Sequence, residues 1–405
     1  MKSFKIPSEF SSQFIQDLRS FRTEQDRLKK DLSPSLLSFD NFNIKLSRHF
    51  GFCFGVQNAI EKIETIIADN PSKRLFLISE IIHNPKVNDA LKEKGVQFIQ
   101  TTSGQQLVDW KEIQKDDIVI TPAFGTSTEI NEILRSKGID PKKYDTTCPF
   151  VERVWNKGEE LMSKGATIVI HGKANHEETR ATFSRINGPC VIVETKKEAE
   201  LLCQFINGEK DSIEEWRVEF GERANEQFNF QTDLNELAVI NQTTMLASET
   251  QGIANIIQEA AVSKNKSFLS SRDTLCYATN DNQTATLKLI EEGFDLALVI
   301  GGEKSSNTNH LQELLSKAGK AFFIRDEDDI LSLNEIEHFD IHLEKRVKES
   351  GYFPSKKHPT IAITAGASCP DATIEKVIQK LLSINNQNTD IQAAIDNYKN
   401  QFSGL

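Results

Sequence analysis

The sequence predicts an α/β protein made of three similar units whose sheets are mostly parallel. The first observation is a motif that occurs three times, in which a cysteine in a polar or glycine-rich turn directly precedes an amphipathic helix. The three cysteines are Cys53, Cys148 and Cys276. The second observation is that apolar, β-rich runs alternate with helical patterns after each cysteine, which is typical of parallel sheets wrapped by helices. Three such units around a pseudo-threefold axis would form a trefoil with one central site.

The expected elements recur in the same order in each unit. The strands are 74–79, 96–99 and 117–121 in the first unit, 166–170, 190–193 and 237–240 in the second, and 296–300, 321–324 and 360–364 in the third. Helices are expected over 87–94, 151–163 and 285–292, among others. Ligands of parallel sheets gather at the carboxyl ends of the strands. We therefore expect the loops that follow these strands to face one cavity.

The expected domain boundaries follow the repeats. They are an N-terminal extension (1–42), a first unit (43–147), a second unit (148–275) with a polar insertion near 207–233, a third unit (276–385) and a C-terminal tail (386–405). The extension carries a weak helical stripe of apolar residues and no site motif. We expect it to be a surface arm or cap, or a disordered tail, and to be dispensable for the chemistry.

Composition and charge exclude several classes of protein. The chain of 405 residues has a formal net charge of −11, and an acidic chain is a poor candidate for sequence-independent nucleic-acid binding. No apolar run approaches the roughly 18 residues that span a bilayer. The first 40 residues are acidic and lack the apolar stretch of a signal peptide. We therefore expect a cytoplasmic protein without nucleic-acid or membrane partners, whose six cysteines are reduced.

The three repeated cysteines are candidate metal ligands. A thiol at a helix N-terminus feels the positive end of the helix dipole, which favours the thiolate, the form that binds metal. Three such thiolates could hold zinc or an iron–sulfur cluster, although the paired spacing of structural zinc sites is absent. A closed 4Fe–4S cluster normally takes four cysteines. Three would leave one iron open to act as a Lewis acid on a substrate.

The other three cysteines have different surroundings. Cys190 lies in a strand pattern and Cys203 on a helical one, so both are expected in the core. Cys369 adjoins the Gly-Ala-Ser run at 366–368, which should reach the central cavity. A fourth-ligand role and a core role are both open for Cys369.

The loops at the strand ends are rich in hydrogen-bond donors. They carry His83, His176, Thr243, Ser305, Ser306, Asn307 and Ser368. Together with backbone N–H groups, these side chains suit a phosphate or diphosphate. The Ser-Ser-Asn run could instead be only a helix cap. Glu178, near a helix start, could stabilise the helix dipole or donate a proton beside a metal site.

Seven stretches together resemble the 4-hydroxy-3-methylbut-2-enyl diphosphate reductase family, over roughly residues 45–385. They are Gly-Phe-Cys-Phe-Gly-Val, Glu-Ile-Ile-His-Asn-Pro, Asp-Thr-Thr-Cys-Pro, His-Gly-Lys-Ala-Asn-His-Glu-Glu, Asn-Gln-Thr-Thr, Ser-Ser-Asn and Thr-Ala-Gly-Ala-Ser. The resemblance implies a trefoil around a 4Fe–4S cluster held by Cys53, Cys148 and Cys276. It also implies reductive removal of an allylic hydroxyl as water, which yields isopentenyl and dimethylallyl diphosphates in the last step of the methylerythritol phosphate route to isoprenoids.

The same resemblance assigns roles to the loop residues. It makes Glu178, Thr243 and His176 catalytic, with Glu178 in the proton relay. It makes His83, His176, Gln242, Thr243, Ser305, Ser306, Asn307 and Ser368 the substrate-binding residues. Phe124 stands where many members carry a histidine, so one phosphate contact is missing. This form is similar to the plant and cyanobacterial branch, so the expected electron donor is ferredoxin or flavodoxin.

Two other functions are compatible with the same residues. The first is an iron–sulfur hydro-lyase that eliminates water without net reduction, which product analysis with and without reductant would distinguish. The second is a cluster-binding sensor without enzymatic activity. In a sensor, the loops that carry the carboxyl and hydroxyl groups would have no function. Their presence therefore favours an enzyme.

Overall fold

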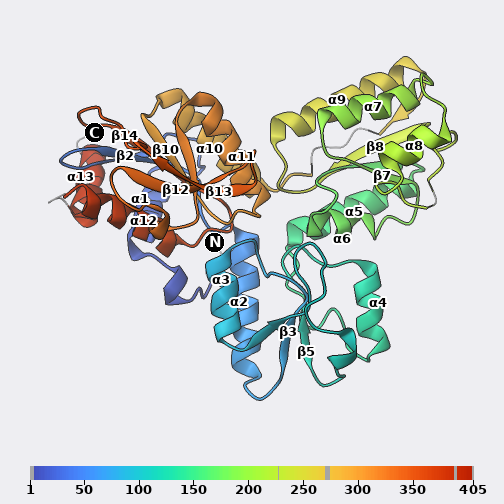
Figure 1. Ribbon diagram of the computed structural model, residues 1–405, viewed down its shortest axis with the longest axis horizontal. Coiled ribbons are helices and arrows are strands. Elements are labelled where there is room, and N and C mark those ends of the chain that lie inside the picture. The colour runs from blue at the N-terminus through green and yellow to red at the C-terminus, as the bar shows by residue number, and fades with distance from the viewer. Residues whose placement is uncertain (1–3, 227, 270–273, 387–389, 404–405) are drawn as a thin grey trace. The chain divides into compact units, whose positions relative to one another are not determined.

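The computed structural model describes residues 4–226, 228–269, 274–386 and 390–403. Its chain forms two compact units (Figure 1). The terminal unit consists of Met1–Gln57, His83–Val87 and Tyr277–Leu405, and the central unit of Asn58–Ile82 and Asn88–Cys276. Helices α2 (Phe54–Asp69) and α3 (Pro85–Glu93) cross the unit boundaries in the sequence.

The central unit contains two sheets. The first has the strand order β4-β3-β5 and is entirely parallel. Its elements are β3 (Leu75–Leu77), β4 (Val96–Phe98), β5 (Ile118–Ile120) and α4 (Thr128–Ser136). Phe76 and Val119 of this sheet pack with Leu134 of α4 in one buried cluster. β3 and β5 are short but bury all their side chains, which explains their uninterrupted apolar sequences, whereas β4 at the edge leaves Gln97 exposed.

The second sheet has the order β7-β6-β8-β9 and is also parallel. Its strands are β6 (Thr167–His171), β7 (Cys190–Val193), β8 (Glu236–Asn241) and β9 (Ser267–Phe268). Its helices are α5 (Pro149–Ser163), α6 (Glu177–Phe183), α7 (Lys196–Ile206) and α9 (Ala247–Ser263). Ile168 packs in the cluster that contains Val154 of α5, whereas Val169 packs with residues of α7 and α9. Successive strand residues thus cover opposite faces.

The insertion near 207–233, expected only to be polar, contains a folded element. Helix α8 (Ile213–Phe220) buries Trp216 and Phe220 in the cluster that includes Phe205. The Phe205 and Trp216 rings lie edge to face with centroids 5.1 Å apart, and Phe230 stacks on Trp216 at 5.3 Å. The few large aromatic residues supply the apolar surface that aliphatic residues supply elsewhere.

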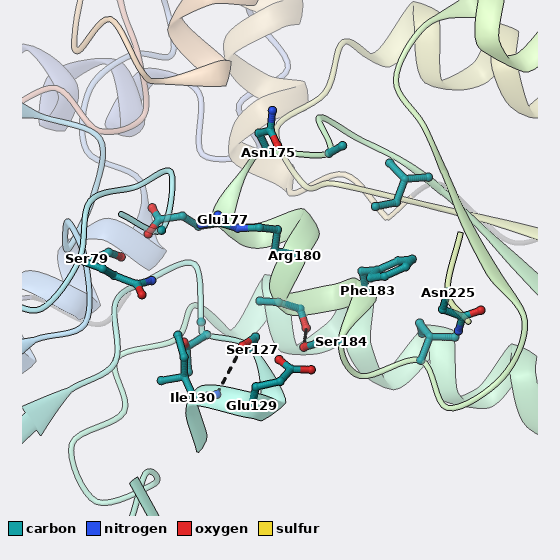
Figure 2. Close-up of a pocket in the computed structure, with 18 of the residues that line it drawn as sticks. Ser79, Ser127, Glu129, Ile130, Asn175, Glu177, Arg180, Phe183, Ser184 and Asn225 are labelled. Atoms are coloured by element: carbon teal, nitrogen blue, oxygen red, sulfur yellow. Dashed lines mark hydrogen bonds between the residues drawn. The ribbon is translucent and has the colours of Figure 1, made fainter. Parts of the chain in front are cut away.

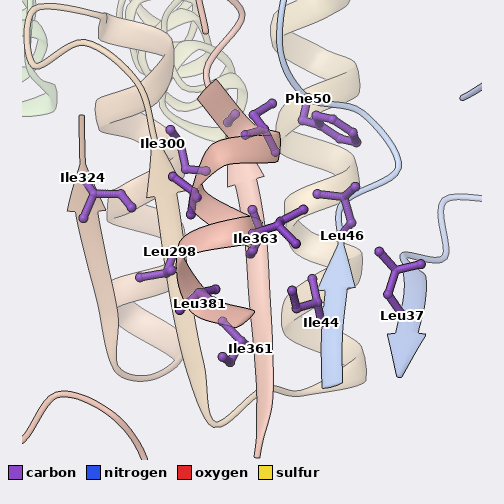
Figure 3. Close-up of a cluster of buried hydrophobic side chains, with 14 of the residues drawn as sticks. Leu37, Ile44, Leu46, Phe50, Leu298, Ile300, Ile324, Ile361, Ile363 and Leu381 are labelled. Atoms are coloured by element: carbon purple, nitrogen blue, oxygen red, sulfur yellow. The ribbon is translucent and has the colours of Figure 1, made fainter. Parts of the chain in front are cut away.

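The terminal unit contains the third sheet, in the order β1-β2-β14-β10-β11. Its strands are β1 (Ser35–Ser38), β2 (Asn43–Leu46), β10 (Leu296–Ile300), β11 (Ala321–Ile324) and β14 (Thr360–Ala365). Only β1 is antiparallel to its neighbour. The helices are α10 (Tyr277–Glu292), α11 (Ser306–Ala318) and α12 (Asp371–Ile384). Figure 3 shows Ile363 and Leu298 of the sheet in one cluster with Leu381 of α12.

The same unit has a β-hairpin that the sequence did not predict. Strands β12 (Glu335–Asp340) and β13 (Lys345–Ser350) pair only with each other, in antiparallel register. Their alternation of charged and apolar residues is short, and most of β13 is exposed or half-buried. The hairpin therefore leaves little hydrophobic signal.

The three sheets repeat one arrangement, which confirms the predicted α/β class with mostly parallel sheets. In β4-β3-β5, β7-β6-β8 and β11-β10-β14, the first strand along the chain lies between the second and the third. The structure differs from the boundary expected at residue 43, because β2 joins the third sheet beside β14. The strand before Cys53 thus completes the sheet formed by the end of the chain. A sequence pattern shows that a strand exists, but not which sheet it joins.

Residues of the expected N-terminal extension, from Phe14 to Phe42, also contribute to this unit's core, which differs from the expected arm, cap or tail. Helix α1 (Gln13–Gln25) buries Phe14, Ile15 and Leu18 in the same cluster as Ile363. The C-terminal tail adds α13 (Ile391–Ser403), which contacts α1 and β1. This packing indicates that the segment contributes to the stability of the unit, whereas its dispensability for the chemistry stays a prediction. No helix of the described residues is long and apolar enough to cross a membrane.

Candidate active site

Each of the three repeated cysteines is anchored in the same way. The backbone N–H of Cys148 donates to the carbonyl of Ala123 at 2.9 Å, that of Cys276 to Thr243 at 3.1 Å, and that of Cys53 to Ala367 at 3.1 Å. Each acceptor lies in the loop directly after the third strand of a repeat. The three cysteines therefore lie at the carboxyl edges of the three sheets, in agreement with the sequence-based expectation.

A threonine two residues before the cysteine strengthens this anchor in the central unit. The Thr146 hydroxyl donates to the carbonyl of Thr121 at 2.6 Å. The Thr274 hydroxyl donates to the Asn241 carbonyl at 2.9 Å and accepts from the Asn241 N–H at 2.7 Å. Sequence reasoning missed these two threonines, although the shared Thr-x-Cys spacing was a signal for them.

Within the central unit, two thiols and one carboxyl influence one another. The pKa of Cys148 is raised to about 11, first by burial and then by the negative charges of Cys276 and Glu178. Backbone N–H groups at the start of α5 lower this pKa, as the helix-dipole argument predicts, but the desolvation outweighs them. The main effects on the pKa of Cys148 include no nearby positive charge. A thiolate-bound metal ion would supply that charge, so these residues fit an iron–sulfur cluster.

Glu178 is held by two short hydrogen bonds from one residue. The Thr243 backbone N–H donates to Oε1 at 2.6 Å, and the Thr243 hydroxyl donates to Oε2 at 2.8 Å. The Glu178 residue is 1% exposed. Its own N–H donates to Nδ1 of His176, the N-cap of α6, at 3.2 Å. A buried carboxyl bonded to a hydroxyl can pass a proton through that hydroxyl, so the site can do acid–base chemistry.

Gln242 holds two loops together. Its side-chain oxygen accepts from the N–H of Lys173 at 3.0 Å and from the Thr179 hydroxyl at 3.0 Å. Its amide nitrogen donates to the Thr244 hydroxyl at 2.8 Å. The amide is therefore engaged within the protein, and the direct substrate contact expected for Gln242 stays a prediction.

Phe124 packs on a predicted catalytic residue. The rings of Phe124 and His176 lie edge to face, with centroids 5.5 Å apart. Phe124 follows β5 in the loop that anchors Cys148. The phenyl ring therefore restricts the histidine by packing, where a histidine at this position would offer a donor.

The terminal unit gathers the neutral donors. Ser305 caps α11 by accepting from the N–H of Thr308 at 3.3 Å. The Asn307 side-chain oxygen accepts from the N–H of Ala367 at 3.0 Å and from Asn282 at 3.3 Å. Among the described residues, Nδ2 of Asn307 has no hydrogen-bond partner, although the residue is 2% exposed. A buried donor without a partner is costly, which indicates a ligand that accepts from it.

Two further residues join this group through backbone contacts. The Ser368 hydroxyl donates to the carbonyl of His83 at 3.2 Å. A Cβ on Gly302 would lie 2.3 Å from the same carbonyl oxygen, so only glycine allows this approach. Ser306, like the others, is buried at the start of α11. The structure thus brings together His83, Ser305, Ser306, Asn307 and Ser368 in one unit.

The remaining cysteines are buried in hydrophobic surroundings. Cys190 and Cys203 belong to the clusters of the second sheet, as predicted. Cys369 is 0% exposed and belongs to the main cluster of the terminal unit. Burial raises the pKa of its thiol. This environment favours the core role for Cys369 over that of a fourth ligand.

A cavity of about 790 Å³ lies in the central unit (Figure 2). It is lined by Asn175 and Glu177, on either side of His176, and by Arg180 of α6. Ser127, which caps α4 through the N–H of Ile130, borders the same space. None of the predicted catalytic residues lines it. No group of three His, Cys, Asp or Glu side chains of the described residues is arranged to hold a metal, so the ligand set stays a prediction.

Parallel sheets whose carboxyl ends carry thiols, a buried carboxyl and hydroxyl donors are typical of an α/β enzyme. The chain belongs to the LytB protein family, whose model matches residues 44–382. It is 38% identical over 361 residues to the 4-hydroxy-3-methylbut-2-enyl diphosphate reductase of Synechococcus sp. (strain WH7803), covering 87% of this chain and 88% of that protein. It is 36% identical over 384 residues to the reductase of that name from Gloeothece citriformis (strain PCC 7424), covering 93% and 90%.

Solved structures agree with the family. One is described as (E)-4-hydroxy-3-methyl-but-2-enyl diphosphate reductase, the terminal enzyme of the non-mevalonate pathway. It has a TM-score of 0.51 at 25% identity and covers 84% of this chain and 99% of its own. A reductase structure from Plasmodium falciparum has a TM-score of 0.62 at 22% identity, covers 85% and 88%, and supports the fold alone.

Proposed function

We propose that this chain is a 4-hydroxy-3-methylbut-2-enyl diphosphate reductase. It removes the allylic hydroxyl of the (E)-4-hydroxy-3-methylbut-2-enyl diphosphate substrate as water and yields isopentenyl and dimethylallyl diphosphates. The reaction consumes two electrons and two protons, one proton leaving in the water and the other entering the carbon chain. The observation that carries the proposal is the group of Cys148 and Cys276 with the buried pair Glu178 and Thr243, in a member of this family.

An iron–sulfur cluster fits the thiols of the site. We propose that Cys53, Cys148 and Cys276 hold one 4Fe–4S cluster, whereas the three buried cysteines do not. When bound, the cluster would supply electrons and one open iron that acts as a Lewis acid on the substrate hydroxyl. Ferredoxin or flavodoxin would deliver the electrons. The supporting observations are the shared backbone anchor of the three cysteines and the negative charges of Cys276 and Glu178, which raise the pKa of Cys148 after burial.

Glu178 and Thr243 would transfer a proton to the substrate. The Thr243 hydroxyl, 2.8 Å from Oε2 of Glu178, can donate to a leaving oxygen while it accepts the proton of the carboxyl. His176 fixes the first turn of α6 and therefore the direction of the Glu178 side chain. Because the carboxyl is buried, bulk water does not compete with this transfer.

The neutral donors of the terminal unit suit the diphosphate. Asn307 offers Nδ2, and Ser305, Ser306 and Ser368 offer hydroxyls, with His83 beside them. Neutral donors and the N-terminus of α11 can bind an anion without a lysine or arginine. Phe124 contributes no donor, so binding here uses one contact fewer than in relatives with a histidine.

Anaerobic product analysis tests the proposal. Iron-loaded protein, the hydroxylated diphosphate and an artificial reductant should yield both isoprenoid diphosphates, and omission of the reductant should abolish them. A dehydrated product that forms equally well without reductant would show a hydro-lyase. Absence of any product from protein that contains iron and binds the substrate would favour a sensor.

A further inference from the structure

The terminal unit contains another cavity, of about 600 Å³, which lies beside Cys53. It is lined by α1, by the loop that follows it and by the segment that leads to Cys53. None of the residues predicted to bind the diphosphate substrate lines this cavity. It borders the donor group only through Asn282, which lines the cavity and donates to Oδ1 of Asn307.

One residue that lines this cavity, Arg48, is a buried cation. The residue is 7% exposed, and its Nε has no hydrogen-bond partner among the described residues. Its Nη2 reaches only a backbone carbonyl, that of Arg22, at 3.4 Å. Within the described part of the chain, no carboxylate forms an ion pair with Arg48. The charges of Asp26 and Asp31 act on the guanidinium without an ion-pair contact. Because a buried guanidinium is costly unless an anion pairs with it directly, an anionic ligand would supply the missing contact.

Neighbouring charges make the cavity positive. Lys29 lines it with an exposed side chain. The pKa of His49 is lowered to about 4, first by burial and then by the charges of Arg48 and Lys29. The lining also holds two carboxylates, Glu24, which is exposed, and Asp281, whose pKa is raised by burial.

The rest of the wall is aromatic. Phe4 and Phe54 meet edge to face with centroids 5.0 Å apart. Phe50 lies beneath the guanidinium of Arg19 at 4.7 Å, and that charge is already paired with Asp371. The cavity thus combines one unpaired buried cation with phenyl rings. This combination suits a ligand with an anionic head and an apolar chain.

We propose that this cavity binds an amphipathic anion, a molecule with a phosphate or diphosphate group and an apolar chain. The phosphate pairs with Arg48, because a planar guanidinium matches phosphate oxygens in a bidentate arrangement. The chain packs on the phenyl rings toward Cys53. The choice of a prenyl chain for the test rests on the proposed function, whereas the anion site itself does not.

Anaerobic calorimetry on the iron-loaded protein tests the proposal with inorganic diphosphate, geranyl diphosphate and geraniol. Geranyl diphosphate should bind at least tenfold more tightly than inorganic diphosphate, and geraniol should not bind detectably. Arg48→Met should weaken both anions at least tenfold, since it removes the charge and keeps an apolar side chain of similar length. Lys348→Met, which removes an exposed cation on β13, should leave both affinities unchanged.

Two further variants make each result decisive. Ser368→Ala disturbs the substrate group but not this cavity, so binding that is lost in Ser368→Ala and kept in Arg48→Met would overturn the proposal. Equal affinity for geranyl diphosphate and inorganic diphosphate would contradict the proposal that the ligand carries an apolar chain. If Arg48→Met fails to fold, Lys29→Met tests the anion site instead. The Lys29 side chain is exposed, so its substitution should not disturb folding. Lys29→Met should weaken the anions about threefold, and unchanged binding would count against the site. These affinities are measured without turnover. The result therefore tests the anion site independently of the reductase activity.

Discussion

The two units of the chain carry different candidate functional groups. The central unit supplies ionisable groups that influence one another, namely Cys148, Cys276 and Glu178. The terminal unit supplies Cys53 and a group of neutral donors such as Asn307. The difference suggests a division of labour in which one unit handles protons and the other holds the phosphate groups. Variants in the two units should therefore fail in different ways.

The largest effect should come from the cysteines, the one feature that both units share. Cys53→Ser, Cys148→Ser and Cys276→Ser should each lose bound iron and activity, because a serine hydroxyl does not replace a thiolate ligand. Cys190→Ser is the control, since this thiol is buried inside a strand. Iron analysis of anaerobically purified protein is the measurement. Full iron content in Cys276→Ser would contradict the assignment of Cys276 as a cluster ligand.

Deletion of residues 1–42 should disable the terminal unit alone. The deletion removes β1 and the buried face of α1, so the main cluster of that unit loses part of its apolar surface. We expect insoluble protein or a markedly lower melting temperature, measured by calorimetry. A soluble truncated chain with unchanged melting temperature would contradict the packing seen here.

The sequence anticipated the strands better than their grouping. The apolar runs at β6, β8, β10 and β14 were located to within a residue or two, because buried parallel strands are continuously apolar. That β2 joins β14 was not predictable, since pairing depends on contacts far apart in the sequence.

The site shows the same limit. Repeated motifs identified the cysteines and their loops, and the resemblance supplied the roles. The hydrogen bonds between Glu178 and Thr243 required coordinates, because the two residues are 65 positions apart. The effect of burial on Cys148 was also missed, since the helix-dipole argument considers only the local backbone.

Glu178→Gln should lower turnover by about 10²–10⁴-fold, because the amide keeps the shape but cannot act as an acid. Iron content should be unchanged. Glu177→Gln is a matched control, since Glu177 lines the separate cavity of the central unit. Anaerobic assays with an artificial reductant give the rates. Near-normal turnover in Glu178→Gln would leave only the helix-dipole role for this carboxyl.

Asn307→Ala should raise KM by roughly tenfold, because a lost hydrogen bond to a charged group costs about 1.5–3 kcal/mol. The rate at saturation should change much less. Lys317→Ala, at the other end of α11, is the control and should behave like the unaltered protein. A lower kcat with unchanged KM would place Asn307 in the chemistry and break the division between the units.

Phe124→His should produce the smallest change and sharpen the comparison with relatives that carry a histidine. The new donor should lower KM about threefold, within the range of one hydrogen bond. Phe124→Leu, which adds no donor and loses the ring contact with His176, should not lower KM. Steady-state kinetics distinguishes the two variants, and an equal KM for both would remove the proposed phosphate contact at this position.

Substrate affinity in the absence of reductant tests the division of labour most directly. Calorimetry on iron-loaded protein measures the Kd of the hydroxylated diphosphate without turnover. The account predicts that Glu178→Gln keeps its Kd within about threefold of the unaltered protein, whereas Asn307→Ala binds roughly tenfold more weakly. The opposite result, weak binding by Glu178→Gln and normal binding by Asn307→Ala, would contradict it.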